Sequence, residues 1–122
     1  MSGGAHPVLV VDDDPDIRET LGLVLGSRGY AVTVAADGVE ALERLRAMSP
    51  PPCLVLLDLM MPGMNGFEVW QAMEATDLSA IPVVALTGAG PAARARAQEL
   101  RLEVLAKPIG LEQLLEAVAR FC

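Results

Sequence analysis

Two apolar runs in this chain each end in aspartate, and this pattern constrains the fold more than any other feature. Residues 8–11 precede Asp12, Asp13 and Asp14, and residues 53–57 precede Asp58. Short continuous runs of valine and leucine are typical of strands buried on both faces of a parallel sheet. Because parallel strands present their carboxyl ends at one edge, where open α/β sheets bind ligands, these aspartates are expected to lie close together. Carboxylates gathered in this way repel each other, so the sequence predicts a compensating divalent cation beside a reactive aspartate.

Strand-like and helix-like segments alternate along the whole chain. The expected strands are residues 8–11, 31–35, 54–57, 82–86 and 103–106, and the expected helices are residues 15–28, 39–48, 67–74, 91–100 and 111–121. Asp14, Pro15 and Gly29 supply the N-cap, the first turn and the end of the first helix. Alternation with short connections predicts a doubly wound α/β domain, with helices on both faces of a parallel sheet and right-handed crossovers.

Length and charge narrow the classes of function. A chain of 122 residues is expected to form one domain, residues 1–122, with residues 1–6 as a flexible N-terminal segment. No segment approaches the roughly 18 continuous apolar residues of a membrane span, and the start lacks the features of a signal peptide, so we expect a cytoplasmic protein. The net charge of −7 argues against direct binding of nucleic acid, which relies on clustered Lys and Arg.

The chain has two cysteines, and neither belongs to a disulfide framework or a zinc-binding spacing. Cys53 heads an apolar strand and is expected to be a small buried apolar side chain, and Cys122 stands at the end of the sequence. We therefore expect unpaired thiols in a reducing compartment.

Four of the five strand ends carry polar residues of complementary chemistry. These are Asp12 and Asp13 after the first strand, Asp58 after the third, Thr87 after the fourth and Lys107 after the fifth. Three carboxylates suit Mg²⁺, which prefers oxygen ligands, and a carboxylate can also act as a nucleophile that forms an acyl phosphate. A lysine and a hydroxyl can then neutralise and bind phosphoryl oxygens. Asp14 is excluded from this set because its place before Pro15 suits a helix cap.

Four motifs in this order resemble the receiver domain of two-component response regulators. They are residues 10–15 (VVDDDP), 56–66 (LLDLMMPGMNG), 86–88 (LTG) and 106–108 (AKP), and the resemblance runs from about His6 to the last residue. It implies a flavodoxin-like (βα)5 fold with strand order 2-1-3-4-5 and a site at the switch point between the first and third strands.

The resemblance also implies a role for each matching residue. Asp58 would accept a phosphoryl group from the phosphohistidine of a histidine kinase or phosphotransfer protein. Asp13, Asp58 and the Met60 carbonyl would bind Mg²⁺ directly, and Asp12 would act through a water on the metal. Lys107 and Thr87 would contact the phosphoryl group, and the Lys107–Pro108 bond would be cis. The domain would then be a signalling phosphoacceptor with slow self-dephosphorylation, acting on a downstream output domain or protein, and not a turnover enzyme.

One departure from the family pattern affects the expected signalling face, formed by the fourth strand, fourth helix and fifth strand. The family commonly has Tyr or Phe three residues before the lysine, where this chain has Val104. A β-branched side chain has few rotamers and cannot reproduce an aromatic swing. Thr87 and Lys107 are also 20 positions apart, which looks about two residues shorter than the usual spacing, so the fourth helix or its following loop is expected to be trimmed.

Two other functions remain open from the sequence. A Mg²⁺-dependent aspartyl phosphatase also uses an aspartate nucleophile, but it commonly has a second aspartate two residues later as general acid. Here that position is Met60, which cannot transfer a proton. A degenerate receiver would bind partners without phosphorylation, and the complete set of acidic, hydroxyl and lysine residues argues against it.

Overall fold

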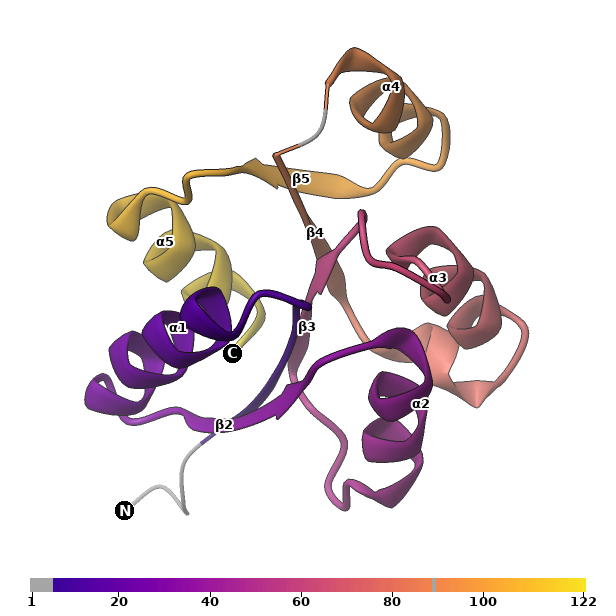
Figure 1. The fold of residues 1–122 in the computed structure, drawn as a ribbon. Helices are drawn as coiled ribbons and strands as arrows, with labels where there is room; N and C mark the ends of the chain where they lie inside the picture. The colour runs from indigo at the N-terminus through magenta and orange to yellow at the C-terminus, as the bar shows by residue number, and fades with distance from the viewer. Residues whose placement is uncertain (1–5, 89) are drawn as a thin grey trace.

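A computed structural model describes residues 6–88 and 90–122 as a five-stranded parallel sheet with helices on both faces (Figure 1). The strands are β1 Pro7–Val11, β2 Ala31–Ala35, β3 Leu54–Asp58, β4 Val83–Thr87 and β5 Glu103–Ala106. The helices are α1 Pro15–Ser27, α2 Gly38–Ala47, α3 Gly66–Glu74, α4 Pro91–Glu99 and α5 Leu111–Phe121. The strand order is β2-β1-β3-β4-β5, which confirms the predicted flavodoxin-like topology. Element bounds differ from the expected ones by no more than one residue at either end.

The two faces of the sheet are packed by different helices. Figure 1 shows α1 and α5 on one side, α2 and α3 on the other, and α4 beside the edge strand β5. Alternate residues of β1 therefore enter different cores: Leu9 and Val11 pack with α2 and α3, whereas Val8 and Val10 pack with α1 and α5. All five residues of β3 are buried, as expected for the central strand of a doubly wound sheet.

Side-chain caps fix where the helices begin next to the carboxyl ends of the strands. The Asp14 side chain accepts a hydrogen bond from the Asp16 N–H at the start of α1, which confirms its capping role. Asp37 caps α2 in the same way, and Asn65 forms a capping box with Glu68 at the start of α3. These caps end the loops after β1, β2 and β3 at defined positions, so the polar residues in those loops are held between fixed elements.

Two features of the fold differ from the sequence-based expectations. A short 3₁₀ helix, η1, spans Asp77–Ala80 between α3 and β4, a segment that the sequence left as a connection. The expectation of unpaired cysteines is wrong, because Cys53 and Cys122 form a disulfide with their Cα atoms 5.5 Å apart. They are 69 positions apart in the sequence, and they meet because α5 packs back along the sheet and ends beside the start of β3.

The predicted flexible segment, residues 1–6, lies outside the described residues except for His6, which is exposed. Within the described residues, no helix combines the length and apolar character needed to cross a membrane.

Candidate functional site

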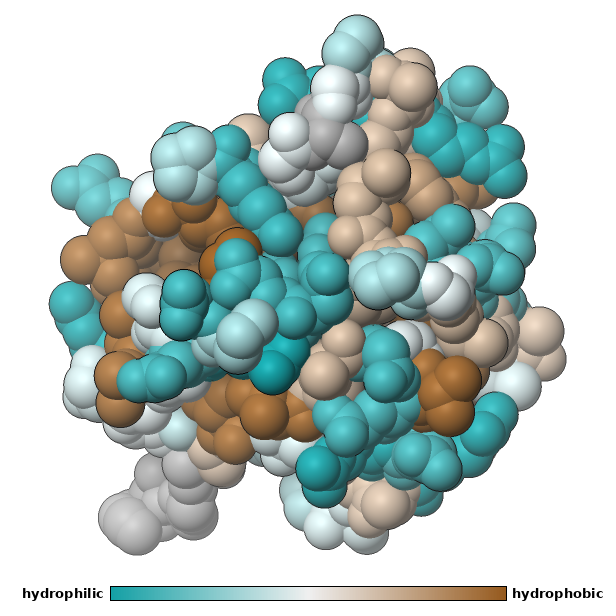
Figure 2. Space-filling view, viewed as in Figure 1, coloured by the Kyte–Doolittle hydropathy of each residue, from teal (hydrophilic) through white to brown (hydrophobic). Residues whose placement is uncertain are grey.

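The predicted acidic residues come together at the carboxyl ends of β1 and β3. These strands are direct neighbours, with Val11 paired to Leu57, so Asp12, Asp13 and Asp58 follow at the same edge of the sheet. One carboxylate oxygen of each lies within 4.8 Å of the others. Asp12 and Asp58 are buried, whereas Asp13 is exposed. Figure 2 shows hydrophilic residues gathered over the centre of this face, where β1 and β3 end in Figure 1.

Lys107 extends from the end of β5 to the buried carboxylates. Its Nζ lies 2.8 Å from Asp12 Oδ2 and 3.4 Å from Asp58 Oδ2. Burial by itself would lower the pKa of Lys107, but the hydrogen bond to Asp12 and the charge of Asp58 outweigh it and raise the pKa of Lys107 above its usual value. The amine therefore stays protonated and supplies the positive charge that the acidic residues need.

The Asp58 carboxylate sits in an environment that resists ionisation. Burial, with a smaller contribution from the charge of Asp12, raises the pKa of Asp58 from 3.8 to about 6. A hydrogen bond from the Met60 N–H to Oδ1 (3.0 Å) and the charge of Lys107 oppose this rise. Lys107 and the Met60 N–H therefore do not fully offset burial and the charge of Asp12, and a further cation beside Asp58 would favour its ionised form.

Thr87 and Lys107 are held at this edge by the register of β4 and β5. Thr87 is buried and pairs with Ala106, and the Lys107 N–H donates a hydrogen bond to the Thr87 carbonyl at 2.8 Å. The Lys107–Pro108 peptide bond is cis. The two predicted phosphoryl-contacting residues are thereby joined through their backbones beside Asp58, which itself pairs with Leu86 of β4.

Arg18 helps to position the acidic residues, and the sequence did not predict this role. Arg18 lies in the first turn of α1, and its Nη1 donates a 2.7 Å hydrogen bond to the carbonyl oxygen of Asp12. The Asp12 side chain in turn accepts a hydrogen bond from the Asp14 N–H at 2.9 Å. Arg18 therefore fixes the peptide that joins Asp12 to Asp13. No spacing rule identifies this contact, because it depends on how the loop after β1 folds back on the helix.

Gly66 has a different role from the one its sequence context suggests. From the sequence, both Gly63 and Gly66 are expected to allow a turn in the loop after β3, and Gly63 does adopt a left-handed backbone with φ 74°. Gly66 does not, but a Cβ built on it would overlap the backbone carbonyl of Asp58. The absence of a side chain there allows the start of α3 to pack directly against the end of β3.

Val104 packs inward beneath α4. It packs against the small buried cluster of Leu59, Ala85 and Ala97, as Phe67 and Leu102 also do. The helix above it is short and ends at Glu99, with Arg101 in a left-handed conformation (φ 58°). The position that holds an aromatic residue in the family pattern is therefore filled here by a small, half-buried aliphatic side chain.

The chemistry of the acidic cluster fits Mg²⁺. Asp12 is fully buried, and its Oδ2 is directed at Lys107 Nζ, 2.8 Å away. With Asp13 and Asp58, the cluster offers three carboxylates within the reach of one ion, in a shallow hollow also lined by Met60 and Gly88. Hard oxygen ligands at an open site suit Mg²⁺, which retains several waters.

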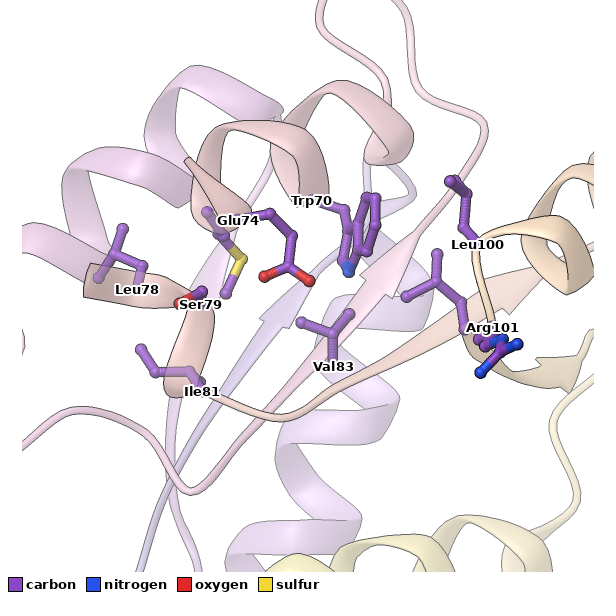
Figure 3. A pocket seen from close by; sticks show the side chains of 10 residues that line it. Trp70, Glu74, Leu78, Ser79, Ile81, Val83, Leu100 and Arg101 are labelled. Atoms are coloured by element: carbon purple, nitrogen blue, oxygen red, sulfur yellow. The ribbon is translucent and has the colours of Figure 1, made fainter. Parts of the chain in front are cut away.

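A separate hollow lies at the opposite edge of the sheet, where β4 and β5 begin (Figure 3). Trp70 and Glu74 line it from α3, and Leu100 and Arg101 line it from the turn before β5. None of the predicted site residues contributes to it, so it is distinct from the acidic edge.

Curated proteins similar in sequence to this chain include response regulators. The DNA-binding response regulator MtrA of Mycolicibacterium smegmatis is 48% identical over 80 residues, which cover 66% of this chain and 33% of the relative. The response regulator MprA of Mycobacterium ulcerans is 40% identical over 111 residues, covering 88% of this chain and 46% of the relative. The chain thus spans less than half the length of these curated relatives.

Solved structures agree over nearly the full chain. A response regulator receiver protein from Pseudomonas putida has a TM-score of 0.89 at 30% identity and covers 98% of this chain and 99% of its own. The chemotaxis protein CheY4 of Vibrio cholerae has a TM-score of 0.85 at 30% identity, covering 98% and 100%. Residues 8–119 match the profile of the response regulator receiver domain. The chain belongs to the response regulator receiver family.

Proposed function

We propose that this chain is a single receiver domain that accepts a phosphoryl group on Asp58 in a Mg²⁺-dependent reaction. The donor is the phosphohistidine of a histidine kinase or phosphotransfer protein in the cytoplasm. The observation that carries the proposal is the convergence of three carboxylates within 4.8 Å, with Lys107 bridging two of them. Such a cluster is costly to fold unless cations occupy it, which supports a site built for metal and phosphate.

Asp12, Asp13 and Asp58 are the residues that would hold the ion, together with the Met60 carbonyl. When bound, Mg²⁺ would lower the charge of the acidic cluster and of the incoming phosphoryl group. Arg18 holds the Asp12–Asp13 peptide in place through its 2.7 Å hydrogen bond. The Met60 N–H, 3.0 Å from Asp58 Oδ1, orients the acceptor carboxylate.

The transfer itself is a displacement at phosphorus. An Asp58 carboxylate oxygen forms a bond to phosphorus as the bond between phosphorus and the imidazole nitrogen of the donor breaks. The electron pair of that bond stays on the imidazole nitrogen, which leaves as neutral histidine once protonated. Lys107 Nζ is close enough to Asp58 to neutralise the phosphoryl oxygens, and the Thr87 hydroxyl can donate a hydrogen bond to them.

Signalling would follow from rearrangement of the β4–α4–β5 face. Thr87 lies at the end of β4, and the loop that follows leads directly to α4. Val104 has too few rotamers to swing as an aromatic residue would, so we infer that the change is carried by the Thr87 loop and α4. The rearranged face would act on a downstream output domain or on a separate protein.

Incubation with acetyl phosphate and Mg²⁺, followed by intact-mass measurement, tests the proposal. We expect a gain of one phosphoryl group that is absent in Asp58→Ala and in the presence of EDTA. Asp77→Ala is the matched control, because Asp77 is exposed in η1, which precedes β4 at the opposite edge of the sheet, and its loss should leave uptake unchanged.

Two results would overturn the proposal. No gain of mass from acetyl phosphate or from a phosphorylated histidine kinase would favour a degenerate receiver. Repeated turnover of a small phosphoester without accumulation would favour an aspartyl phosphatase, although the exposed Met60 side chain offers no proton donor.

A further inference from the structure

We propose that Cys53 and Cys122 form a reversible thiol–disulfide site whose oxidation clamps α5 to β3. The disulfide joins the residue before β3 to the residue after α5. Their Cα atoms are 5.5 Å apart, which is a usual separation for a disulfide. The proposal does not depend on phosphorylation of Asp58, so each can fail without the other.

The disulfide and the acidic site lie at opposite ends of β3. Cys53 lies at one end of β3 and Asp58 at the other, roughly 16 Å away for a strand of this length. Asp58 is paired with Lys107, 3.4 Å away, and Lys107 lies four positions before the first residue of α5. The far end of α5 carries Cys122. One end of β3 is therefore held to the connection before α5 by an ion pair, and the other end is held to the residue after α5 by a covalent bond.

Both redox states have suitable surroundings. Cys53 and Cys122 are half-buried against the apolar core of α1, α5 and the sheet, where a thiol also packs well as a small apolar group. Cys53 Sγ lies 3.1 Å from the Pro7 carbonyl oxygen. In the disulfide this sulfur carries no proton, but in the reduced form its S–H can donate a hydrogen bond to that oxygen. The Cys53 thiol would therefore keep a hydrogen-bond partner after the bond opens.

The exchange balances with a low-molecular-weight disulfide such as oxidised glutathione. One cysteine thiolate attacks the small disulfide, forming a mixed disulfide and releasing one small thiol. The second cysteine thiolate then attacks the mixed disulfide, which closes the Cys53–Cys122 bond and releases the second small thiol. The protein loses two electrons and two protons, and the small disulfide gains both. Two small thiols reverse the reaction, and the partial exposure of both cysteines admits them.

Oxidation is expected to act mainly on α5. The bond closes a loop across 69 positions, which restricts the unfolded chain strongly. In the folded state it ties down a helix end that would otherwise open locally. The acidic edge lies at the other end of β3, so phosphoryl acceptance should be equal in the two states.

The test equilibrates the intact protein in buffers of reduced and oxidised glutathione, alkylates free thiols and measures the mass. We expect both cysteines to be blocked from alkylation in oxidised glutathione and both to be alkylated in excess reduced glutathione. The melting temperature should fall by about 10 °C on reduction. Hydrogen exchange should increase in the last turn of α5.

Cys122→Ser and Cys53→Ser provide the controls, since each should melt at the temperature of the reduced parent and show no response to reductant. In Cys53→Ser, the new hydroxyl retains a donor for the Pro7 carbonyl. Two free thiols in excess oxidised glutathione would overturn the proposal. So would a bond that stays closed in excess reduced glutathione, because the cross-link would then be permanent.

Discussion

Lys107 forms an ion pair with Asp12, with its Nζ 2.8 Å from Asp12 Oδ2, although β1 and β5 are not neighbours in the sheet. The lysine side chain crosses the ends of β3 and β4 to reach this carboxylate. Its positive charge offsets part of the repulsion between the buried carboxylates of Asp12 and Asp58. The stability of the metal-free protein should therefore depend on Lys107.

Replacing Lys107 by methionine should destabilise the metal-free protein by about 3 kcal/mol, because two buried carboxylates lose their cation. Urea unfolding in EDTA measures this loss, and added Mg²⁺ should restore part of it. Arg94→Met removes an exposed positive charge from α4 and should change stability by less than about 0.5 kcal/mol. Equal stability of the two variants in EDTA would contradict the role given to Lys107.

Asp58 should make the metal-free protein less stable as pH rises. Its pKa is raised from 3.8 to about 6 in the folded state, so between these values the folded protein binds more protons than the unfolded chain. Stability therefore falls from about pH 4 to pH 6 and stays lower above that range. Asp58→Asn should remove this cost and stabilise the protein at pH 7.5 in EDTA by on the order of 2 kcal/mol.

The pH dependence supplies its own control for Asp58→Asn. At pH 3.5 the parent carboxyl is mostly protonated in both states, so most of the gain in free energy of unfolding should disappear. Chemical denaturation at pH 3.5 and pH 7.5 gives the comparison. An asparagine variant less stable than the parent at pH 7.5 in EDTA would show that Asp58 is not held in an unfavourable environment.

Gly66→Ala should cost about 2 kcal/mol, because the new methyl group overlaps the Asp58 carbonyl and forces α3 away from β3. Displacement of Asp58 should also slow phosphoryl uptake from acetyl phosphate. Gly26→Ala is the matched control: Gly26 is exposed within α1 with nothing near the new Cβ, and alanine should stabilise the helix by about 0.5–1 kcal/mol. If both alanine variants were equally stable, the close approach at Gly66 would be unimportant.

Arg101→Gly should stabilise the protein by about 0.5–1 kcal/mol, because Arg101 holds φ 58° at the end of α4. The Leu102 N–H bonds to the Ala97 carbonyl across this residue, which is the pattern that glycine usually closes. Thermal unfolding measures the gain. Arg101→Ala keeps the unfavourable φ and should give no gain, so a similar rise in both variants would point to loss of the charge instead.

The residues that meet at the acidic edge were predictable because the pattern is local. Each polar residue follows a continuous apolar strand, and parallel topology places all such ends together. Val104 was identified as a departure by position alone. Arg18 and Gly66 were not predicted in their roles, since one depends on a loop folding back onto α1 and the other on the distance between two backbones.

The sequence by itself determined the order of the strands and helices, the Asp14 cap that begins the first helix, and the set of residues at the carboxyl edge. These follow from hydrophobic periodicity and from short-range hydrogen bonding, which a linear pattern records. Only the tertiary structure decided that Cys53 meets Cys122, that Gly66 must lack a side chain, and that Lys107 reaches Asp12. These relationships join residues from separate elements, and they depend on packing distances that no periodicity encodes.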